Sequence, residues 1–404
     1  MDPAALARLL TPEGWALLGQ LPPYSEDAAL RISEGLRARG LDPDLVAAAL
    51  TQSRLRAKAV EKFGEFASGM LLTAEGLEQA TRLEVAALHA RRYAEAGAGL
   101  VADLGCGLGA DSLAMAGLGL RVLAIEKDEA TAACAQMNLR AFPEAQVRHA
   151  DGLELDLLAE GVDAIFTDPA RRTRRGNRVF DPKAYSPDLD TVLALADTIP
   201  DLGIKVAPGI PYTALPSHTH AQWVSVNGAV VEAGLWFGRL ATEGAGRSAI
   251  LLTDAGTHHL GWSGDADARA TQAPDGLLAA YLHEPDGAII RAGLVADVAD
   301  QLGGHLVDPS IAYITTAQPV TTPFARSYRV LDHFGFGLKR LRAYLRNRNV
   351  GRVTIKKRGT AVVPEQLRQQ LQLSGDASAT IVLTRLQGEQ SVLVVDPLET
   401  AGRE

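Results

Sequence analysis

A short strand that ends in an acidic residue and three alternating glycines is the feature that most constrains this chain. The strand begins at Val101 and carries its acid at Asp103, and the glycines follow at Gly105, Gly107 and Gly109. Glycines at such a strand-to-helix turn supply unusual backbone angles and let a ligand lie against the main chain, and the next helix presents its positive N-terminal end. The turn therefore predicts a site for a charged, nucleotide-like ligand.

The glycines alone fit two classes of ligand. Gly105, Gly107 and Ala110 match the G-x-G-x-x-[GA] fingerprint of NAD and FAD proteins. Asp103 argues against a dinucleotide, because its pyrophosphate would pass close to this acid, whereas an anion there suits a cationic ligand. Glu126 ends the next apolar strand, 21 residues after Gly105. A carboxylate at that point can hold both ribose hydroxyls in either class.

A third apolar strand, over residues 161–167, also ends in an acid. The residues that follow it are Asp168, Pro169, Ala170 and Arg171. This run is similar to the fourth methyltransferase motif, [DN]-P-P-[YFW], which lies beside the transferred methyl group. With the first two strand ends, it favours a methyltransferase over a dinucleotide-binding protein.

The chain has the length and composition of a multidomain enzyme. Its 404 residues predict two to three domains at about 150 residues each. Residues 1–75 have apolar side chains at helical spacing, and residues 76–257 alternate strands with helices, as in a parallel sheet covered on both faces. Residues 258–275 shift to Gly, Asp, Ala and Thr and predict a linker, and residues 276–404 predict a small α/β domain.

The strands expected in the central block lie near 100–104, 121–126, 146–150, 162–167, 202–207, 222–226, 230–236 and 248–253. In the last domain we expect strands at 326–332, 350–357, 379–385 and 390–395 and helices near 337–347 and 364–371.

Several classes of protein are disfavoured by the composition. The chain has no apolar run of about 18 residues, and Met1-Asp2-Pro3 lacks the basic start of a signal peptide, so we expect a cytoplasmic protein without membrane association. The two cysteines, Cys106 and Cys134, cannot form a disulfide framework or a cysteine zinc site. The histidines lack nearby acids at ligand spacing, so we expect no metal.

The charge of the last domain is lopsided. Between Arg326 and Arg358 the only acid is Asp332, and the net charge is +10. The whole chain carries −8, so the remainder carries −18. A basic face on an acidic protein indicates a specific polyanionic partner. The eleven basic residues are Arg326, Arg329, Lys339, Arg340, Arg342, Arg346, Arg348, Arg352, Lys356, Lys357 and Arg358.

These features together resemble a class I S-adenosylmethionine (SAM) methyltransferase of the kind that modifies nucleic acids. A helical N-terminal domain, the Asp168-Pro169-Ala170-Arg171 motif and a basic C-terminal domain resemble bacterial methyltransferases with a THUMP-like domain. The segment from Lys62 to Gly76 is similar to the lead-in of trimethylguanosine synthases. The resemblance implies an α/β, Rossmann-like seven-stranded sheet, SAM as cofactor, and methylation of a nucleotide in tRNA or rRNA.

The resemblance also implies roles for individual residues. Asp103 would face the methionine part of SAM, Glu126 would hold the ribose, and Asp151 with Gly152 would reach the adenine. Asp168 would border the methyl group and orient the nucleophile. Arg171, three residues further on, is our second candidate catalytic residue, on the ground given in the next paragraph. By analogy, Gln79 and Thr81 would line the pocket. The glycines Gly105, Gly107 and Gly109 would shape the cofactor loop, and Arg340, Arg342, Arg346, Arg348, Lys356 and Lys357 would bind RNA.

The chain departs from the family motif at Ala170 and Arg171. Enzymes that methylate exocyclic amines have a second proline and an aromatic residue there, which stacks on the target base. Arg171 could stack its guanidinium plane on a base or pair with a phosphate instead. Two alternatives therefore stay open at this point: a methyltransferase for small molecules or proteins, and a catalytically weak SAM fold that binds RNA.

Overall fold

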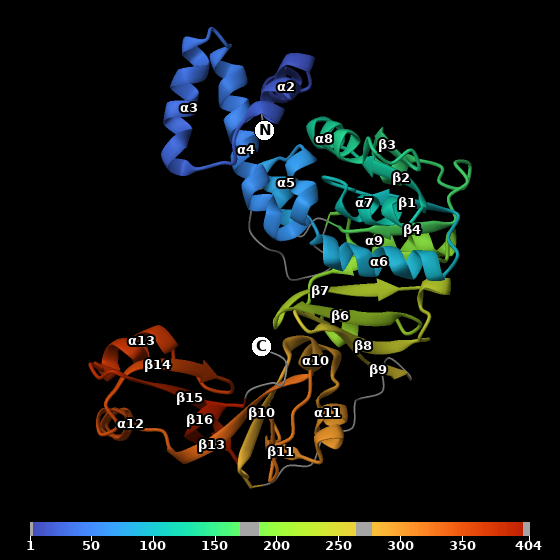
Figure 1. The fold of residues 1–404 in the computed structure, drawn as a ribbon. Helices are drawn as coiled ribbons and strands as arrows, with labels where there is room; N and C mark the ends of the chain where they lie inside the picture. Colours follow the sequence, from blue (N-terminus) through green and yellow to red (C-terminus); the bar gives the residue numbers. More distant parts are fainter. Residues whose placement is uncertain (1–2, 170–185, 264–276, 399–404) are drawn as a thin grey trace. The chain divides into compact units, whose positions relative to one another are not determined.

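A computed structural model describes residues 3–169, 186–263 and 277–398 of the chain (Figure 1). These residues form two compact units. The first comprises residues 1–207 and 235–242, and the second comprises residues 208–234 and 243–404. Each unit has its own hydrophobic clusters, and each is described below by itself.

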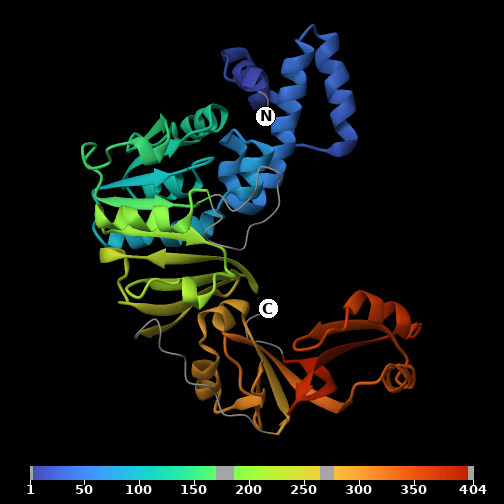
Figure 2. The same cartoon turned by 180° about the vertical axis from the view of Figure 1, so that it is seen from behind.

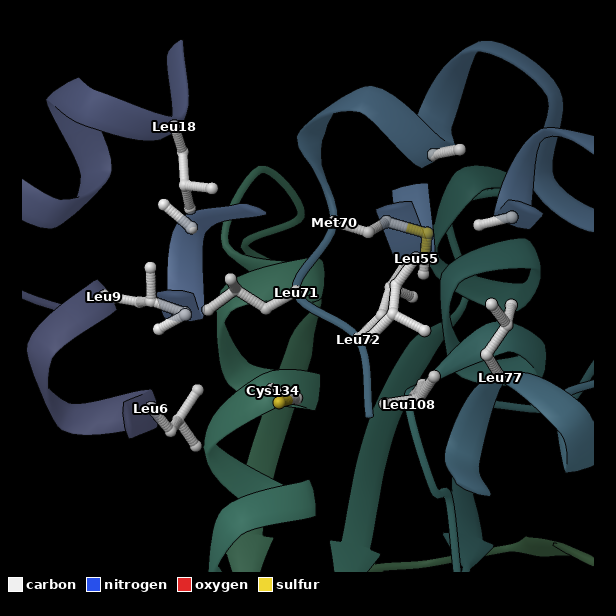
Figure 3. Packing of buried hydrophobic residues seen from close by; sticks show 14 of the residues in the cluster. Leu6, Leu9, Leu18, Leu55, Met70, Leu71, Leu72, Leu77, Leu108 and Cys134 are labelled. Atoms are coloured by element: carbon white, nitrogen blue, oxygen red, sulfur yellow. The ribbon is translucent and has the colours of Figure 1, made fainter. Parts of the chain in front are cut away.

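The first unit opens with helices that pack around the long helix α4, Pro43–Phe63. Thr11 and Asp42 cap α2 and α4 with their side-chain oxygens, and a proline occupies the first turn of each. The buried cluster of these helices continues into Leu108 and Cys134 of the following α/β domain (Figure 3). The remaining elements of this part are α1 (Pro3–Leu9), α2 (Pro12–Gln20), α3 (Glu26–Ala38), η1 (Gly64–Gly69), α5 (Ala74–Gln79) and α6 (Leu83–Glu95).

The extended segment Met70–Leu72 joins the helical part to the α/β domain. Asn138 accepts from Leu71 N at 2.7 Å and donates to Leu71 O and Leu108 O at 3.1 and 2.9 Å. From the other side, Gln52 donates to Leu72 O and accepts from Leu72 N at 2.7 and 3.0 Å. Both amides are buried. The segment is thus clamped between the two parts of one core, which Figure 3 shows around Leu71 and Leu72.

Parallel strands form the α/β part of the first unit. β1 pairs with β2 and β4, β2 with β3, and β4 with β5. Helix α6 lies in front of these strands in Figure 1, and α9 lies in front of them in the view from behind, so helices cover both faces (Figure 2). The elements are β1 (Leu100–Leu104), α7 (Ala110–Gly117), β2 (Arg121–Glu126), α8 (Glu129–Leu139), β3 (Ala145–His149), η2 (Gly152–Glu154), β4 (Ala164–Thr167), α9 (Leu189–Leu193), η4 (Ala194–Asp197) and β5 (Leu202–Val206).

The sheet as a whole follows the order β3-β2-β1-β4-β5-β7-β6-β8-β9. The resemblance implies seven strands, whereas the sheet has nine. β8 matches the strand expected at 248–253, and β9 is the one strand of this sheet that was not expected. β6 and β8 are parallel, and β8 and β9 form an antiparallel hairpin. The later elements of this stretch are η5 (Tyr212–Ala214), β6 (His220–Val226), β7 (Ala229–Trp236), η6 (Gly238–Leu240), β8 (Gly246–Thr253) and β9 (Gly256–Ser263).

The second unit also contains a seven-stranded sheet with the order β11-β12-β10-β13-β16-β15-β14. Helices α12 and α13 bury Leu341, Leu345 and Leu367 against its β14 end. The elements are β10 (Tyr281–Pro285), α10 (Gly287–Ala292), α11 (Val295–Leu302), β11 (His305–Asp308), β12 (Ile311–Thr316), β13 (Ala325–Gly335), α12 (Leu338–Arg346), β14 (Val350–Lys357), α13 (Pro364–Leu371), β15 (Ala377–Leu386) and β16 (Glu389–Pro397).

The α/β fold class and the elements expected after residue 325 are confirmed, with strand ends shifted by a few residues. One expectation was wrong. Residues 258–263, assigned to a linker from their composition, belong to β9. This strand pairs with β8 through a tight turn, so its backbone hydrogen bonds hold a sequence that has little apolar character. The elements β10–β12, α10 and α11 were not expected from the sequence.

Candidate functional site

A cavity of about 830 Å³ lies in the first unit, where the parallel strands end. The carboxyl ends of parallel strands meet at one edge of a sheet, so acids that follow separate strands gather there. Four predicted site acids line this one cavity: Asp103, Glu126, Asp151 and Asp168. Gly105, Gly107 and Gly152 line it as well, whereas Gly109 is the N-cap of α7 and does not line the cavity.

The glycine turn forms the floor of the cavity. Gly105, Gly107 and Gly109 have φ values of 75°, 57° and 82°, a region that side-chain-bearing residues rarely adopt. A Cβ added at Gly105 or Gly107 would meet no atom within 4 Å. Since both residues line the cavity, a side chain there would occupy space that is open to a ligand. The turn therefore exposes backbone to the cavity, as the sequence predicts.

Asp103 is a buried acid at the end of β1. Its Oδ2 accepts a hydrogen bond from Ser112 Oγ at 2.6 Å, and its exposed fraction is 2%. Burial raises the pKa of Asp103 to about 7, the nearby Asp111 adds to the rise, and the Ser112 hydrogen bond opposes it. A cationic group beside Asp103 would restore its charge, so this position favours an ammonium or sulfonium ligand.

Glu126 and Asp151 are oriented by backbone N–H groups. Glu126 accepts from Gly107 N at 3.0 Å through Oε2 and from Asp128 N at 2.9 Å through Oε1. Both oxygens keep further lone pairs for ligand hydroxyls. Asp151 caps the short helix η2 by accepting from Leu153 N at 3.1 Å. Both carboxylates are thus held at the cavity wall in fixed positions.

Asp168 lies at the end of β4 and is bonded to a lysine that sequence reasoning missed. Lys205 Nζ donates to Asp168 Oδ2 at 2.7 Å. Lys205 belongs to β5, whose residues are all buried. Its signal in the sequence was a single lysine inside an apolar strand, with no spacing rule to connect it with Asp168. Arg171, the other predicted catalytic residue, lies outside the described residues.

Lys205 belongs to a buried polar network. Its Nζ also donates to Thr81 Oγ1 at 2.9 Å, and the Thr81 hydroxyl donates to Asp111 Oδ2 at 2.7 Å. The second oxygen of Asp111 lies 2.7 Å from Nδ1 of His89. Burial opposes ionisation of Asp111, yet the hydrogen bond and charge of His89, with Lys205 and Thr81, bring its pKa below the ordinary value.

Helix α5 and the residues around it form one wall of the cavity. Thr73 caps α5 by accepting from Gly76 N at 3.0 Å. Lys62 Nζ donates to the carbonyls of Leu77, Glu78 and Ala80 at 2.7 to 2.8 Å, and burial lowers the pKa of Lys62 to about 8. Gln79 and Thr81 line the cavity, which confirms the expectation for these two residues.

The basic residues predicted to bind RNA lie in the second unit, on α12, on β14 and between them. Lys339, Arg340, Arg346, Arg348 and Lys357 are exposed. Arg348 lies 3.6 Å from the ring centroid of Tyr344, and Arg340 lies 4.7 Å from that of Phe334. Four of the predicted residues also bond within the protein. Lys356 pairs with Glu284 at 2.5 Å, and Arg342, Arg346 and Arg348 donate to the backbone carbonyls of Gln370, Gln372 and Tyr344.

The cavity has the groups that a nucleoside with a cationic amino-acid arm requires. A glycine cradle lies open, a buried acid stands at the first strand end, and a carboxylate oriented by two N–H groups ends the second strand. The residues present therefore fit SAM. The fold and this cavity define a class I methyltransferase.

Comparisons with known proteins agree with this assignment. Residues 102–169 match the model of a methyltransferase domain, residues 325–397 match that of a THUMP domain-like family, and residues 2–59 match a domain of unknown function. An uncharacterized SAM-dependent methyltransferase of Mycobacterium tuberculosis, found in two strains, is 33% identical over 347 residues, which are 82% of this chain and 90% of the relative. The chain belongs to the SAM-dependent methyltransferases, and it is an enzyme with a THUMP-like domain at its C-terminal end.

A solved structure supports the fold. A crystal structure from Porphyromonas gingivalis W83, described as that of a methyltransferase, superposes with a TM-score of 0.75 at 21% identity. The match covers 94% of this chain and 100% of the other. This likeness extends over both compact units of the chain, so the fold of the central block and that of the C-terminal domain occur together in another protein.

Within residues 3–169, 186–263 and 277–398, no helix has the length and apolar content needed to span a bilayer. The same part of the chain holds no group of three or more His, Cys, Asp or Glu side chains arranged to bind a metal ion.

Proposed function

We propose that this enzyme methylates a nucleotide in tRNA or rRNA. The observation that carries the proposal is the coincidence of two features in residues 325–397. This stretch matches a THUMP domain-like family, and it contains the strongly basic segment of an otherwise acidic chain. THUMP domains proper bind tRNA. A polyanion is the partner that such a charge distribution favours.

The exposed side chains of this segment suit single-stranded or irregular RNA. Arg340, Arg346, Arg348 and Lys357 carry their charges at the surface. Arg348 and Arg340 lie over aromatic rings, an arrangement that leaves guanidinium planes for stacking on bases as well as for pairing with phosphates. Lys356 supports the proposal less, because Glu284 neutralises its charge.

The proposed cofactor roles follow the geometry of the cavity. Bound SAM supplies a methyl group on a sulfonium, which is already a good leaving group. Asp103 holds the cationic amino-acid end, Glu126 accepts from the ribose hydroxyls, and Asp151 with Gly152 contacts the adenine. Because both Glu126 oxygens are fixed by backbone N–H groups, this residue binds the ribose without first ordering its own side chain.

Asp168 acts on the other reactant. Its carboxylate accepts a hydrogen bond from the group that is methylated and thereby turns the lone pair of the target atom toward the methyl group. Methyl transfer is an in-line displacement, so alignment is the main task of the protein, and positioning of this kind contributes up to about 7–11 kcal/mol. Arg171 stays a proposed partner of the target base or phosphate, in place of the family aromatic.

Transfer of a labelled methyl group into fractionated cell extract tests this function. The extract comes from a strain that lacks the protein, and the purified enzyme is added with methyl-labelled SAM. We expect label in RNA that ribonuclease removes, and none with the Asp168→Ala variant. Label in protein or in small molecules would transfer the assignment to one of the alternative substrate classes. Absence of label from every fraction would favour a catalytically weak protein.

A further inference from the structure

Lys205 is the group that binds Asp168 within the described part of the chain. Only 6% of the Lys205 side chain is exposed, whereas 25% of the Asp168 side chain is exposed at the cavity. Burying an ammonium is costly unless it is paired and hydrogen-bonded. An apolar side chain would fill this position in β5 at lower cost, so the presence of a lysine calls for a role beyond packing.

The partners of Lys205 fix its direction. The single hydroxyl proton of Thr81 is donated to Asp111, so the Thr81 oxygen is an acceptor on the side of Lys205. Asp111 is in turn bound by His89, which packs against Phe166 and Trp236 with ring centroids at 5.1 and 5.6 Å. The network thus runs from a rigid aromatic core to Asp168.

We propose that Lys205 is a positioning residue, which holds the Asp168 carboxylate in one orientation at the cavity wall and is itself held by Thr81. The inference rests on the proposed role of Asp168 toward the nucleophile. With Oδ2 bound to Lys205, the carboxylate cannot rotate freely, and its remaining acceptor capacity serves the target atom. The lead-in segment before α6 therefore contributes to catalysis through Thr81, although it lies outside the strands that carry the methyltransferase motifs.

A double-mutant cycle tests the proposal with the full-length enzyme, its RNA substrate and saturating SAM. Asp168→Asn lowers kcat by about 100-fold or more, the scale of a positioned polar group. Lys205→Met lowers kcat by about tenfold or more, with SAM affinity by calorimetry within about threefold of wild type. The combined variant is no slower than Asp168→Asn alone, because Lys205 acts only through Asp168. Lys205→Arg recovers part of the loss.

Controls separate positioning from general damage. Tyr93→Phe removes a buried hydrogen bond of 2.6 Å to Ile165 O on β4, the strand that directly precedes Asp168, and is expected to lower the melting temperature while kcat stays unchanged. Thr81→Val keeps the charges of Lys205 and Asp168 and removes only the linking hydroxyl, and we expect it to lower kcat. It provides the test if Lys205→Met does not fold. Thr81→Ser retains activity.

The outcomes distinguish this inference from the proposed function. If Asp168→Asn is slow but Lys205→Met has a normal kcat, the role of Lys205 alone is overturned. If Lys205→Met does not fold, a normal kcat of Thr81→Val overturns it instead. Losses that multiply in the combined variant overturn it as well, since they mean an independent effect. A normal Asp168→Asn variant overturns both, because Asp168 then does not orient the nucleophile.

Discussion

The buried carboxyl of Asp103 predicts that SAM binding weakens as the pH falls through neutrality. Its pKa is about 7 because of burial and the neighbouring acids, and the cationic end of SAM requires the ionised form. The carboxyl is then ionised in about one molecule in ten at pH 6 and in about nine in ten at pH 8. We therefore expect the affinity for SAM to fall about tenfold between pH 8 and pH 6, about 1.4 kcal/mol.

Isothermal titration calorimetry over this pH range measures the effect directly. Binding at pH 6 should also release a proton to the buffer, which calorimetry detects as a dependence of the heat on the buffer. Asp103→Asn keeps the shape of the side chain but cannot ionise, so it should bind SAM more weakly at pH 8 and lack this component of the profile. The ligand's own titration is common to both proteins. Parallel pH profiles for wild type and variant would refute the reasoning.

Three further predictions concern RNA binding, stability and the cofactor loop. Changing Arg346, Arg348 and Lys357 to Glu should weaken RNA binding and flatten the dependence of log affinity on log salt by about 0.7 per lost phosphate contact. Lys356→Gln should leave the slope unchanged, because Lys356 is already paired with Glu284. Equal slopes for wild type and both variants would exclude Arg346, Arg348 and Lys357 from the RNA-binding surface. Asn138→Leu should lower the free energy of unfolding by roughly 3 kcal/mol in urea titrations, because buried backbone groups of Leu71 and Leu108 lose their hydrogen-bond partner. A loss below about 1 kcal/mol would contradict the idea that Asn138 holds the segment Met70–Leu72 in place. Gly107→Ala should cost roughly 1–2 kcal/mol of stability and also reduce SAM affinity more than tenfold. Gly119, at φ 80°, lies away from the cavity, so Gly119→Ala should cost stability only. Equal SAM affinities for the two variants would argue against a role of the glycine turn in binding SAM.

That the strand-end acids line one cavity could be predicted from the sequence, because the signal is local. Asp103 and Glu126 lie in the last two residues of apolar strands, Asp168 directly follows another, and parallel strand ends must meet at one edge of the sheet. No distant partner is needed to place them. The same holds for α12 and β14, whose apolar positions recur at the spacing of a helix and a strand.

What the sequence did not reveal depends on contacts between distant residues. Lys205 lies 37 residues from Asp168 and 124 from Thr81, and no spacing pattern connects the three. The pairing of Lys356 with Glu284 across 72 residues likewise removed one cation from the predicted RNA face. Strand β9 was missed for a related reason, because its stability comes from pairing with β8 rather than from its own side chains.

Mass spectrometry of nucleosides from a strain that lacks the protein tests the central claim most directly. The tRNA and rRNA of this strain are purified separately and compared with those of the parent. One methylated nucleoside should disappear from one RNA class, return with the wild-type gene, and stay absent with the Asp168→Ala variant. Identical nucleoside profiles in parent and deletion strain, with the parent shown to produce the protein, would contradict the assignment of RNA as the substrate.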